Sequence, residues 1–250
     1  MEIREQCKEK RLLKSGEYVC ITREGKRTAG ERSMLVEHSL RICVHGKMIT
    51  KLSCSPQYLP ELILGYLYTE GIVSSVDEIE SISLDRGGST AEVILKDGGT
   101  LPEKRTEEKR KMIPVSPMNW NAEWIFQMAD RLADGMPLHK ETWAVHSCFL
   151  AKRDEILFGC EDIGRHNAFD KVAGYALRHE VDLGQCIVYS SGRIPVDMAV
   201  KAVMAGVPVL AAKADPTKEA VDMAQKYGLT LIGAARQDSM RVYTDRSANL

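Results

Sequence analysis

Two short segments of the sequence place glycine and arginine together where a helix is predicted to begin. One is Glu161–Asn167, which reads EDIGRHN, and the other is Ser190–Arg193, which reads SSGR. The free N–H groups at a helix start attract anions, and a guanidinium binds phosphate oxygens through two parallel hydrogen bonds. The segments therefore predict a site for a phosphate or a diphosphate. Its candidate ligand-binding residues are Glu161, Asp162, Gly164, Arg165, His166, Asn167, Ser191, Gly192 and Arg193.

A purely structural interpretation of the same residues stays open. Each loop could be a capped turn whose arginine pairs with Glu161 or Asp162. Asn167 is a candidate N-cap for the helix that follows, with Asp170 three residues later in the pattern of a capping box. Two common nucleotide-binding sequences, G-x-G-x-x-G and the G-K-[ST] loop, are absent. Two such loops at neighbouring strand ends nevertheless favour the ligand-binding hypothesis.

Both segments lie in a stretch whose hydrophobic pattern alternates between strands and helices. The order of one helix, a hairpin and three helix–strand crossovers predicts a three-layer α/β domain with parallel strands. In open α/β sheets, ligands bind at the carboxyl ends of the strands, which is where both segments fall. The predicted strands are 144–151, 155–160, 185–190, 207–212 and 230–236, and the predicted helices are 121–135, 167–177, 194–206 and 215–228.

The ends of these helices carry local signals. Asn121 is predicted to cap the first helix. Pro195 is predicted to begin the helix that Gly206 ends, and Asp215 is predicted to cap the helix that ends at Gly228. These signals set where each helix starts relative to the strand before it.

The amino-terminal part of the chain has sequence patterns that are mainly typical of β-strands. Residues 39–54 predict a hairpin around the His45–Gly46 turn. Residues 56–71 predict a helix, and residues 78–98 predict a second pair of strands around the Arg86–Gly88 turn. This half of the chain is therefore expected to be an α+β unit with little helix.

A charge-rich segment separates the strand-rich amino-terminal part from the part in which strands and helices alternate. Residues 101–112 lack periodicity, which is typical of a linker or a solvated edge. We expect residues 1–112 to form a smaller β-rich α+β amino-terminal domain with the charged linker. Residues 113–250 are expected to form the α/β domain that binds the ligand. A chain of 250 residues with 44% hydrophobic and 28% charged residues can form two such cores.

The composition argues against several classes of function. The formal net charge is −1, so no overall basic field favours nucleic acid or an anionic membrane. No apolar run is long enough to span a bilayer, and the amino terminus lacks the apolar centre of a signal peptide. We therefore expect a cytoplasmic protein. The 7 cysteines include no Cys-x-x-Cys pair, which argues against a disulfide framework and a zinc ribbon.

The order of elements also resembles the core of the cytidine deaminases. Those enzymes hold zinc through an H-x-E and a P-C-x-x-C sequence at two helix starts. The corresponding positions here are His166–Ala168 and Pro195–Met198, which read HNA and PVDM. The glutamate and the cysteine ligands are missing, so the sequence predicts no bound zinc. A deaminase-like scaffold with another ligand is the interpretation that remains.

Three longer segments resemble the formate dehydrogenase accessory (FdhD) family. Glu161–Val172, EDIGRHNAFDKV, is similar to that family's E-D-V-G-R-H-N-A-x-D-K-V box. Ser191–Arg193 with Lys201–Leu210 resembles its second box, and Ser53–Pro56 with Leu62–Gly71 resembles its amino-terminal box. The similarity runs from about residue 35 to about residue 244, so the chain is identified as a member of the family.

The resemblance implies a function in cofactor maturation. The family passes sulfur from a cysteine desulfurase to the molybdenum or tungsten bis-pyranopterin guanine dinucleotide cofactor, before that cofactor enters formate dehydrogenase. Its members are homodimers with a deaminase-like main domain and a smaller second domain. The cofactor carries two diphosphates and two guanines, which suits two Gly-Arg helix starts and makes GDP a mimic of it.

Two more parts of the family pattern add candidate residues. The family's T-G-G-x-H strand reads Thr142–His146 in this chain, and His146 matches its histidine. The loop after the last strand is an arginine-rich cofactor-binding segment in the family, and only Arg236 keeps the charge here. The resemblance thus adds His146, Ala234, Ala235, Arg236, Gln237, Asp238 and Ser239 to the cofactor-binding candidates.

The chain departs from the family where sulfur is carried. The family's Cys-x-x-Cys lies just ahead of the helix that precedes the hairpin, whereas Lys109–Trp120 contains no cysteine. Cys148 is a speculative catalytic substitute, because the nearby His146 could lower its pKa. The alternative is that Cys148 and Cys160 are buried strand residues. Two hypotheses follow: a sulfurtransferase acting on the molybdenum cofactor, or a cofactor-binding chaperone without sulfur transfer.

Overall fold

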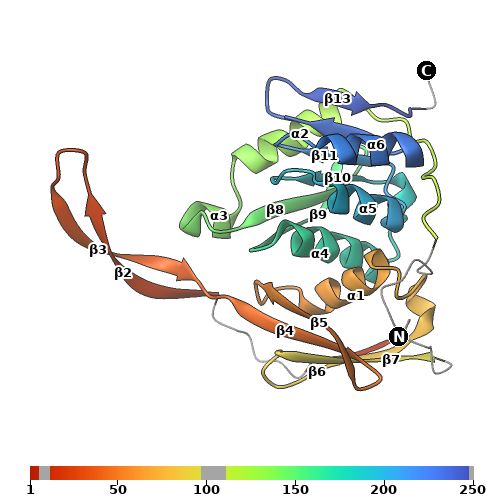
Figure 1. Cartoon of the computed structure of the whole chain (residues 1–250), viewed down its shortest axis with the longest axis horizontal. Helices are drawn as coiled ribbons and strands as arrows, with labels where there is room; N and C mark the ends of the chain where they lie inside the picture. The colour runs from red at the N-terminus through yellow and green to blue at the C-terminus, as the bar shows by residue number, and fades with distance from the viewer. Residues whose placement is uncertain (6–11, 97–110, 248–250) are drawn as a thin grey trace.

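The computed structural model describes residues 1–5, 12–96 and 111–247 (Figure 1). These residues form a six-stranded sheet, a five-stranded sheet and a separate two-stranded ribbon. Most of the predicted linker, 101–112, lies outside the described residues, and so does Cys7. Among the helices that the structure describes, none is long and apolar enough to cross a membrane.

The six-stranded sheet brings the ends of the predicted ligand-binding strands together. Its order is β13-β12-β11-β10-β8-β9. β8 is antiparallel to both β9 and β10, while β11 and β12 continue parallel to β10. β9, β10, β11 and β12 therefore all end at one edge of the sheet. The strands are β8 (His146–Lys152), β9 (Glu155–Asp162), β10 (Ile187–Ser190), β11 (Val209–Ala212), β12 (Thr230–Gly233) and β13 (Arg241–Thr244).

The sheet differs from the prediction at one border. β13 is antiparallel to β12 and was not predicted from the sequence. Its first three residues are exposed, so the segment lacks the buried apolar alternation by which a strand is recognised. The sheet is consequently mixed, with three parallel neighbours, β10, β11 and β12, at its centre.

Helices cover both faces of this sheet. Ile125 of α2 packs with Phe149 and Tyr189 on one face. Leu150 and Val188 point to the other face, where α4, α5 and α6 complete a second apolar core. The helices are α2 (Ala122–Ala133), α3 (Pro137–Thr142), α4 (Arg165–Arg178), α5 (Val196–Ala205) and α6 (Lys218–Tyr227), with a 3-10 turn at Leu183–Gln185.

The start of α4 is not capped as predicted. Gly164 occupies the N-cap position of α4 and Asn167 lies inside the helix, so the prediction of Asn167 as the cap is wrong. The Asn167 amide instead donates hydrogen bonds to the Ser53 carbonyl oxygen at 2.7 Å and to Asp162 Oδ1 at 2.8 Å. The Asn167 side chain therefore makes tertiary hydrogen bonds in place of the local capping bond that the sequence pattern predicts.

The other helix ends follow the predictions in part. Asn121 caps α2 through its side chain, and Gly206 and Gly228 end α5 and α6 in the left-handed conformation, as predicted. Pro195 is the N-cap of α5 and not its first helical residue. α6 is capped by the Thr217 side chain and not by Asp215, whose carboxylate binds Arg241 and Tyr243.

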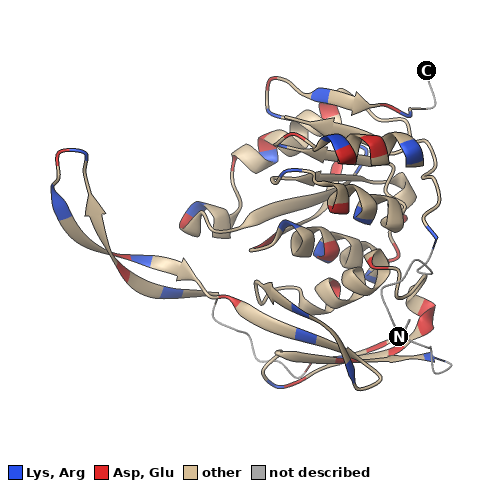
Figure 2. Cartoon of the chain, viewed as in Figure 1, with Lys and Arg blue, Asp and Glu red and all other residues tan. Residues whose placement is uncertain are grey.

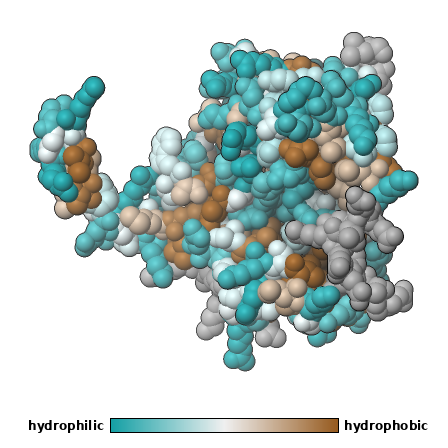
Figure 3. All heavy atoms as spheres, in the orientation of Figure 1, coloured by the Kyte–Doolittle hydropathy of each residue, from teal (hydrophilic) through white to brown (hydrophobic). Residues whose placement is uncertain are grey.

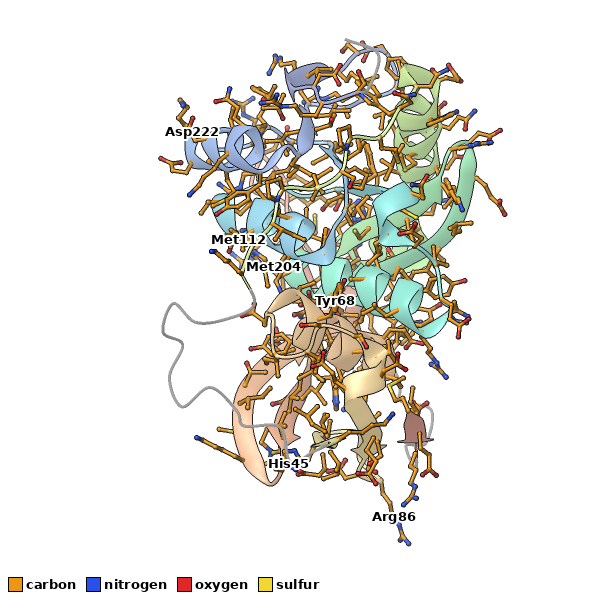
Figure 4. All side chains as sticks on the ribbon, turned by 90° about the vertical axis from the view of Figure 1, so that its right-hand side faces the viewer. His45, Tyr68, Arg86, Met112, Met204 and Asp222 are labelled. Carbon is orange, nitrogen blue, oxygen red and sulfur yellow. The ribbon has the colours of Figure 1, made fainter. Side chains whose placement is uncertain are left out.

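The amino-terminal half forms the five-stranded sheet, in the order β1-β6-β7-β4-β5. Its two predicted hairpins are confirmed, with positive φ at His45 and Gly46 in the first turn. Figure 4 shows His45 and Arg86 at the end of the molecule away from Asp222 on α6. The elements are β1 (Glu2–Glu5), β4 (His38–Val44), β5 (Lys47–Cys54), α1 (Leu59–Thr69), a 3-10 turn (Val76–Glu78), β6 (Ile79–Leu84) and β7 (Thr90–Leu95).

Two glycines let α1 and α4 cross in direct backbone contact. A Cβ atom on Gly65 would lie 1.8 Å from the Asp170 carbonyl oxygen, and one on Gly174 would lie 1.8 Å from the Glu61 carbonyl oxygen. No side chain fits between backbones at that separation. α1 thus joins the core of the five-stranded sheet to the helical layer of the six-stranded sheet.

Buried polar groups reinforce this junction. Lys171 is fully buried, and its Nζ lies 2.6 Å from Asp162 Oδ2 and 2.7 Å from Ser55 Oγ. Ser55 also donates its backbone N–H to Asp162 at 3.0 Å. Lys201 of α5 donates hydrogen bonds to Asp170 of α4 at 2.9 Å and to Thr69 of α1 at 2.8 Å. Buried hydrogen bonds and ion pairs therefore join the amino-terminal half of the chain to α4 and α5.

The ribbon extends away from both sheets (Figure 1). It consists of β2 (Leu13–Ile21) and β3 (Arg27–Leu35), paired only with each other. At its inner end, Arg32 donates hydrogen bonds of 2.8 and 3.2 Å to the Glu141 carbonyl oxygen of α3. The ribbon also exposes apolar side chains, and hydrophobic residues are visible on it in Figure 3. The exposed apolar residues of the ribbon are Tyr18, Val19, Ile21 and Met34.

Candidate functional site

The sequence-predicted residues gather at the edge where β9, β10 and β12 end. The β9–α4 loop, the β10–α5 loop and the β12–β13 loop all leave the sheet there, and antiparallel β8 begins there with His146. Figure 2 shows Lys and Arg residues in several of these loops. The topology therefore brings residues from four separate segments to one border, as the strand-end argument predicts.

The two Gly-Arg segments make contact with each other. A Cβ on Gly192 would lie 3.0 Å from Arg165 Cδ and 3.4 Å from His146 Nδ1. The stem of Arg165 thus crosses directly over the bare backbone of the β10–α5 loop. Arg165 Nε is buried and has no hydrogen-bond partner. Within the described part of the chain, Arg165 forms no ion pair with Glu161 or Asp162, so its charge is not neutralised by the carboxylates beside it in sequence.

Those two carboxylates have structural partners of their own. Glu161 is buried and accepts hydrogen bonds from the backbone N–H groups of Leu138 at 2.9 Å and His139 at 2.7 Å, at the start of α3. Asp162 is fully buried, and besides Lys171 and Ser55 it accepts a hydrogen bond from the Gly164 N–H at 3.0 Å. Glu161 and Asp162 therefore shape the loop, and their oxygens face protein donors.

His146 sits in an electropositive setting. Burial lowers its pKa, and Arg165, His139 and His166 lower it further, against the opposing effect of Asp162. Its Nδ1 lies 3.4 Å from Ser191 Oγ, which also accepts the Ser147 N–H at 3.0 Å. A depressed pKa keeps the imidazole neutral near pH 7. His146 can then act as a neutral hydrogen-bond partner at this edge.

His166 and Asn167 point away from this contact. His166 Nε2 lies 2.9 Å from Asp197 Oδ2 on α5, although the ring N–H is not aligned for a hydrogen bond. Asn167 is used inside the junction. Both line a cavity of about 750 Å³ between α1, α4 and α5, at whose rim Met112 and Met204 lie side by side in Figure 4. In the described ranges, no group of three or more His, Cys, Asp and Glu side chains could hold a metal ion.

The remaining predicted residues lie farther along the same edge. Arg193 and Arg236 are exposed, on the β10–α5 and β12–β13 loops. Ala234 has a φ of 44°, which turns the chain out of β12. The buried Ala235 accepts the Tyr189 hydroxyl at 2.7 Å. Gln237, Asp238 and Ser239 are exposed in that loop. Arg165, Arg193 and Arg236 thus follow three different strands, β9, β10 and β12, that end at this edge.

The structure argues against Cys148 as the sulfur carrier. Cys148 is fully buried beside Cys160 of the neighbouring strand, in register with it. Burial raises the pKa of Cys148 well above its ordinary value and raises the pKa of Cys160 to about 12. The thiolate is the reactive form, and His146 is not charged to stabilise it. The alternative prediction, that both are buried strand cysteines, is confirmed.

Three parts of the site were not predicted from the sequence: α3, the buried Lys171 and the inner end of the ribbon. α3 supplies the N–H groups that hold Glu161, and Pro137 at its first turn is the signal that could have predicted it. Lys171 was quoted only as part of a sequence box, because nothing in a helical pattern shows that a lysine will be fully buried. The inner end of the ribbon also borders this edge, through Arg32.

The fold shows the structural class of the protein. It is a mixed α/β protein that superposes on the crystal structure of a protein named as a formate dehydrogenase accessory protein from Desulfotalea psychrophila. The TM-score is 0.80 at 24% sequence identity, covering 94% of this chain and 97% of the other.

The family follows from the sequence. Residues 35–249 match the model of the FdhD/NarQ family, and the chain belongs to this family. Its relatives include the sulfur carrier protein FdhD of Geobacillus kaustophilus, 32% identical over 246 residues (90% of this chain, 93% of that protein). The sulfur carrier protein FdhD of Methanothermobacter thermautotrophicus is 34% identical over 218 residues (82% of this chain, 86% of that protein).

Proposed function

We propose that this protein is a formate dehydrogenase accessory protein that binds the molybdenum or tungsten bis-pyranopterin guanine dinucleotide at the strand-end edge. There it would carry sulfur from a cysteine desulfurase to that cofactor. The observation that carries the proposal is the crossing of Arg165 over Gly192, with a buried Nε that has no partner. Membership of the FdhD/NarQ family and relatives named as sulfur carriers support it.

The residues at the edge fit a ligand with two diphosphates. The missing side chain of Gly192 leaves room for the stem of Arg165, which holds this arginine between the β9–α4 and β10–α5 loops. Its guanidinium can bind phosphate oxygens through two parallel hydrogen bonds. The N-cap of α4 is Gly164, so the first amides of that helix meet no side-chain oxygen. Arg193 and Arg236 add two exposed cations along the same border. This border therefore offers three arginines to the anionic diphosphates of the ligand.

Removing either arginine of the two loops should weaken GDP binding. We expect Arg165→Ala and Arg193→Ala each to lower GDP affinity by about ten- to hundredfold, since each would lose a charge-assisted contact worth about 1.5–3 kcal/mol. Isothermal titration calorimetry measures the affinity, and melting curves on the same samples report stability. Arg153, on the turn at the opposite edge of the sheet, provides a matched control as Arg153→Ala.

The two measurements separate binding from structure. If Arg165 served only to hold its loop, Arg165→Ala would lower the melting temperature and leave the GDP affinity unchanged. Unchanged affinity in both Arg165→Ala and Arg193→Ala would overturn the proposed anion site.

Sulfur carriage requires a thiol that a donor can reach. Among the described cysteines, Cys54, Cys148, Cys160 and Cys186 are buried, whereas Cys20 on the ribbon is exposed. We expect brief alkylation of the native protein to modify Cys20 and to spare Cys148 until the protein is unfolded. Peptide mass spectrometry after N-ethylmaleimide treatment measures this. Rapid modification of Cys148 in the folded protein would contradict the assignment of Cys148 as a shielded thiol.

The absence of a Cys-x-x-Cys pair from the sequence favours a second candidate function, a cofactor-binding chaperone that transfers no sulfur. Incubation with a cysteine desulfurase and radiolabelled cysteine, followed by non-reducing mass spectrometry, distinguishes the two. Persulfide on any cysteine supports sulfur transfer, and GDP binding without label supports the chaperone.

We further propose a cytidine-deaminase-like fold for residues 113–250, a homodimeric state and a cytoplasmic location. The order β9-β8-β10-β11-β12, with helices on both faces, supports the first. The apolar side chains on the ribbon, whose strands have no other neighbour, support an interface between two copies. The absence of an apolar spanning segment from the sequence agrees with the third.

A further inference from the structure

A cavity of about 560 Å³ lies between the inner half of the ribbon and the strand-end edge. Two of its lining residues connect it to the candidate anion site. Ala144 is two residues ahead of His146, and Ile163 is two residues ahead of Arg165. If a ligand bound with its diphosphate at Arg165, the chemical group next to that diphosphate could reach the cavity. The lining residues are Tyr18, Arg32, Ser33, Met34, Leu35, Glu37, Thr142, Ala144 and Ile163.

The walls of the cavity suit a flat ring. Tyr18 offers an aromatic face, and Met34, Leu35 and Ile163 offer apolar contacts. Several polar groups of the lining are already engaged. Arg32 binds the Glu141 carbonyl oxygen, and Thr142 Oγ1 donates to the Leu138 carbonyl oxygen at 2.7 Å.

Glu37 is the carboxylate of the lining. Its Oε2 accepts the Ser53 hydroxyl at 2.8 Å, which fixes the side chain at the border of the cavity. Within the described residues, its other oxygen, Oε1, has no hydrogen-bond donor. A held carboxylate with a free oxygen can accept N–H groups from a ligand, and it repels ring acceptors.

We infer that this cavity binds the 2-amino-4-oxopyrimidine ring that guanine and pterin share, with Glu37 accepting the ring N–H and the exocyclic amino group. The inference rests on the proposed function, because it places the ring on the ligand whose diphosphate lies at Arg165. Guanine and pterin present two adjacent donors on that ring edge. Adenine presents an acceptor next to its amino group, which the carboxylate disfavours.

Calorimetric titrations of the full chain test this with four probes: GDP, ADP, inorganic diphosphate and 6-hydroxymethylpterin. We expect Glu37→Gln to weaken GDP binding about tenfold, with diphosphate binding unchanged, since one charged hydrogen-bond acceptor is lost. The preference of the parent protein for GDP over ADP should shrink in the same variant. Ser33→Phe, which fills the cavity with a ring on a strand residue, should reduce the GDP affinity to that of diphosphate.

Glu31→Gln is the matched control, because Glu31 is a carboxylate on β3, shortly before Glu37 in sequence, that accepts a hydrogen bond from Ser15 Oγ and does not line the cavity. Glu37-dependent binding of GDP assigns the ring to a guanine, and Glu37-dependent binding of the pterin alone assigns it to a pterin.

The outcomes separate this inference from the proposed function. If neither diphosphate nor GDP binds the parent protein, the proposed anion site is wrong, and the cavity loses its ligand with it. If diphosphate and GDP bind, but Glu37→Gln and Ser33→Phe leave the affinities of GDP and the pterin unchanged, the anion site stands and the cavity inference is overturned.

Discussion

Replacing Gly174 by alanine is expected to lower the free energy of unfolding by about 3 kcal/mol or more, because the new Cβ would overlap the backbone of α1. The Cβ would lie 1.8 Å from the Glu61 carbonyl oxygen, and α1 would have to move away. Helix propensity alone predicts the opposite sign, a gain of about 1 kcal/mol for alanine over glycine. Urea denaturation followed by tryptophan fluorescence measures the change.

A glycine without such a neighbour serves as the control. A Cβ on Gly87, in the β6–β7 turn, would meet its nearest atoms at 3.6 Å, an ordinary contact distance. Gly87→Ala should therefore leave stability nearly unchanged. A Gly174→Ala protein as stable as the parent would show that the close crossing of α1 and α4 does not exist in solution.

The second large effect is expected at the buried lysine. Lys171→Met would leave Asp162 fully buried without its cation, and breaking a buried pair on one side costs about 3–5 kcal/mol. Adding Asp162→Asn to Lys171→Met should recover part of that loss, because no lone charge remains. The same urea denaturation measures the single and the double variant.

An exposed pair provides the comparison. Lys218 pairs with Asp222 on the outer surface of α6, where the two side chains are 75% and 55% exposed. Lys218→Met should change stability little, since exposed ion pairs contribute at most about 1 kcal/mol. A loss in Lys171→Met no larger than that in Lys218→Met would refute the role of Lys171 at the junction.

The elements of the fold could be predicted where local pattern determines them. The hairpin around His45, the strand pair around Arg86 and the helix ends at Gly206 and Gly228 depend on neighbours in sequence, and the structure confirms them. The ribbon and β13 were missed, because their residues are largely exposed and show no buried alternation. Asn167 and Asp215 were misassigned as caps, because each side chain binds a residue distant in sequence.

The candidate site was predictable in its position and not in its inner organisation. Both Gly-Arg loops follow the carboxyl ends of strands that point the same way, as the sequence pattern indicated. The prediction that these two strands are neighbours is wrong, because β8 lies between β9 and β10. The sequence could not show that Glu161 and Asp162 face amides and a lysine, because Leu138 and Ser55 reach them through tertiary contacts. Nor could it show that Cys148 is inaccessible, since burial depends on the helices packed over the strand.

The crossing of α1 and α4 has a consequence for the synthesis of the chain. The ribosome makes the five-stranded sheet and α1 first, and the backbone that must cover Gly65 belongs to Asp170 and Gly174, much later in the sequence. At cellular elongation rates this leaves roughly 5–20 s in which the docking surface of α1, with Ser55 beside it, has no partner. During that interval the nascent amino-terminal half presents an unfilled interface, so cellular chaperones have a target on this protein before its carboxyl-terminal half exists.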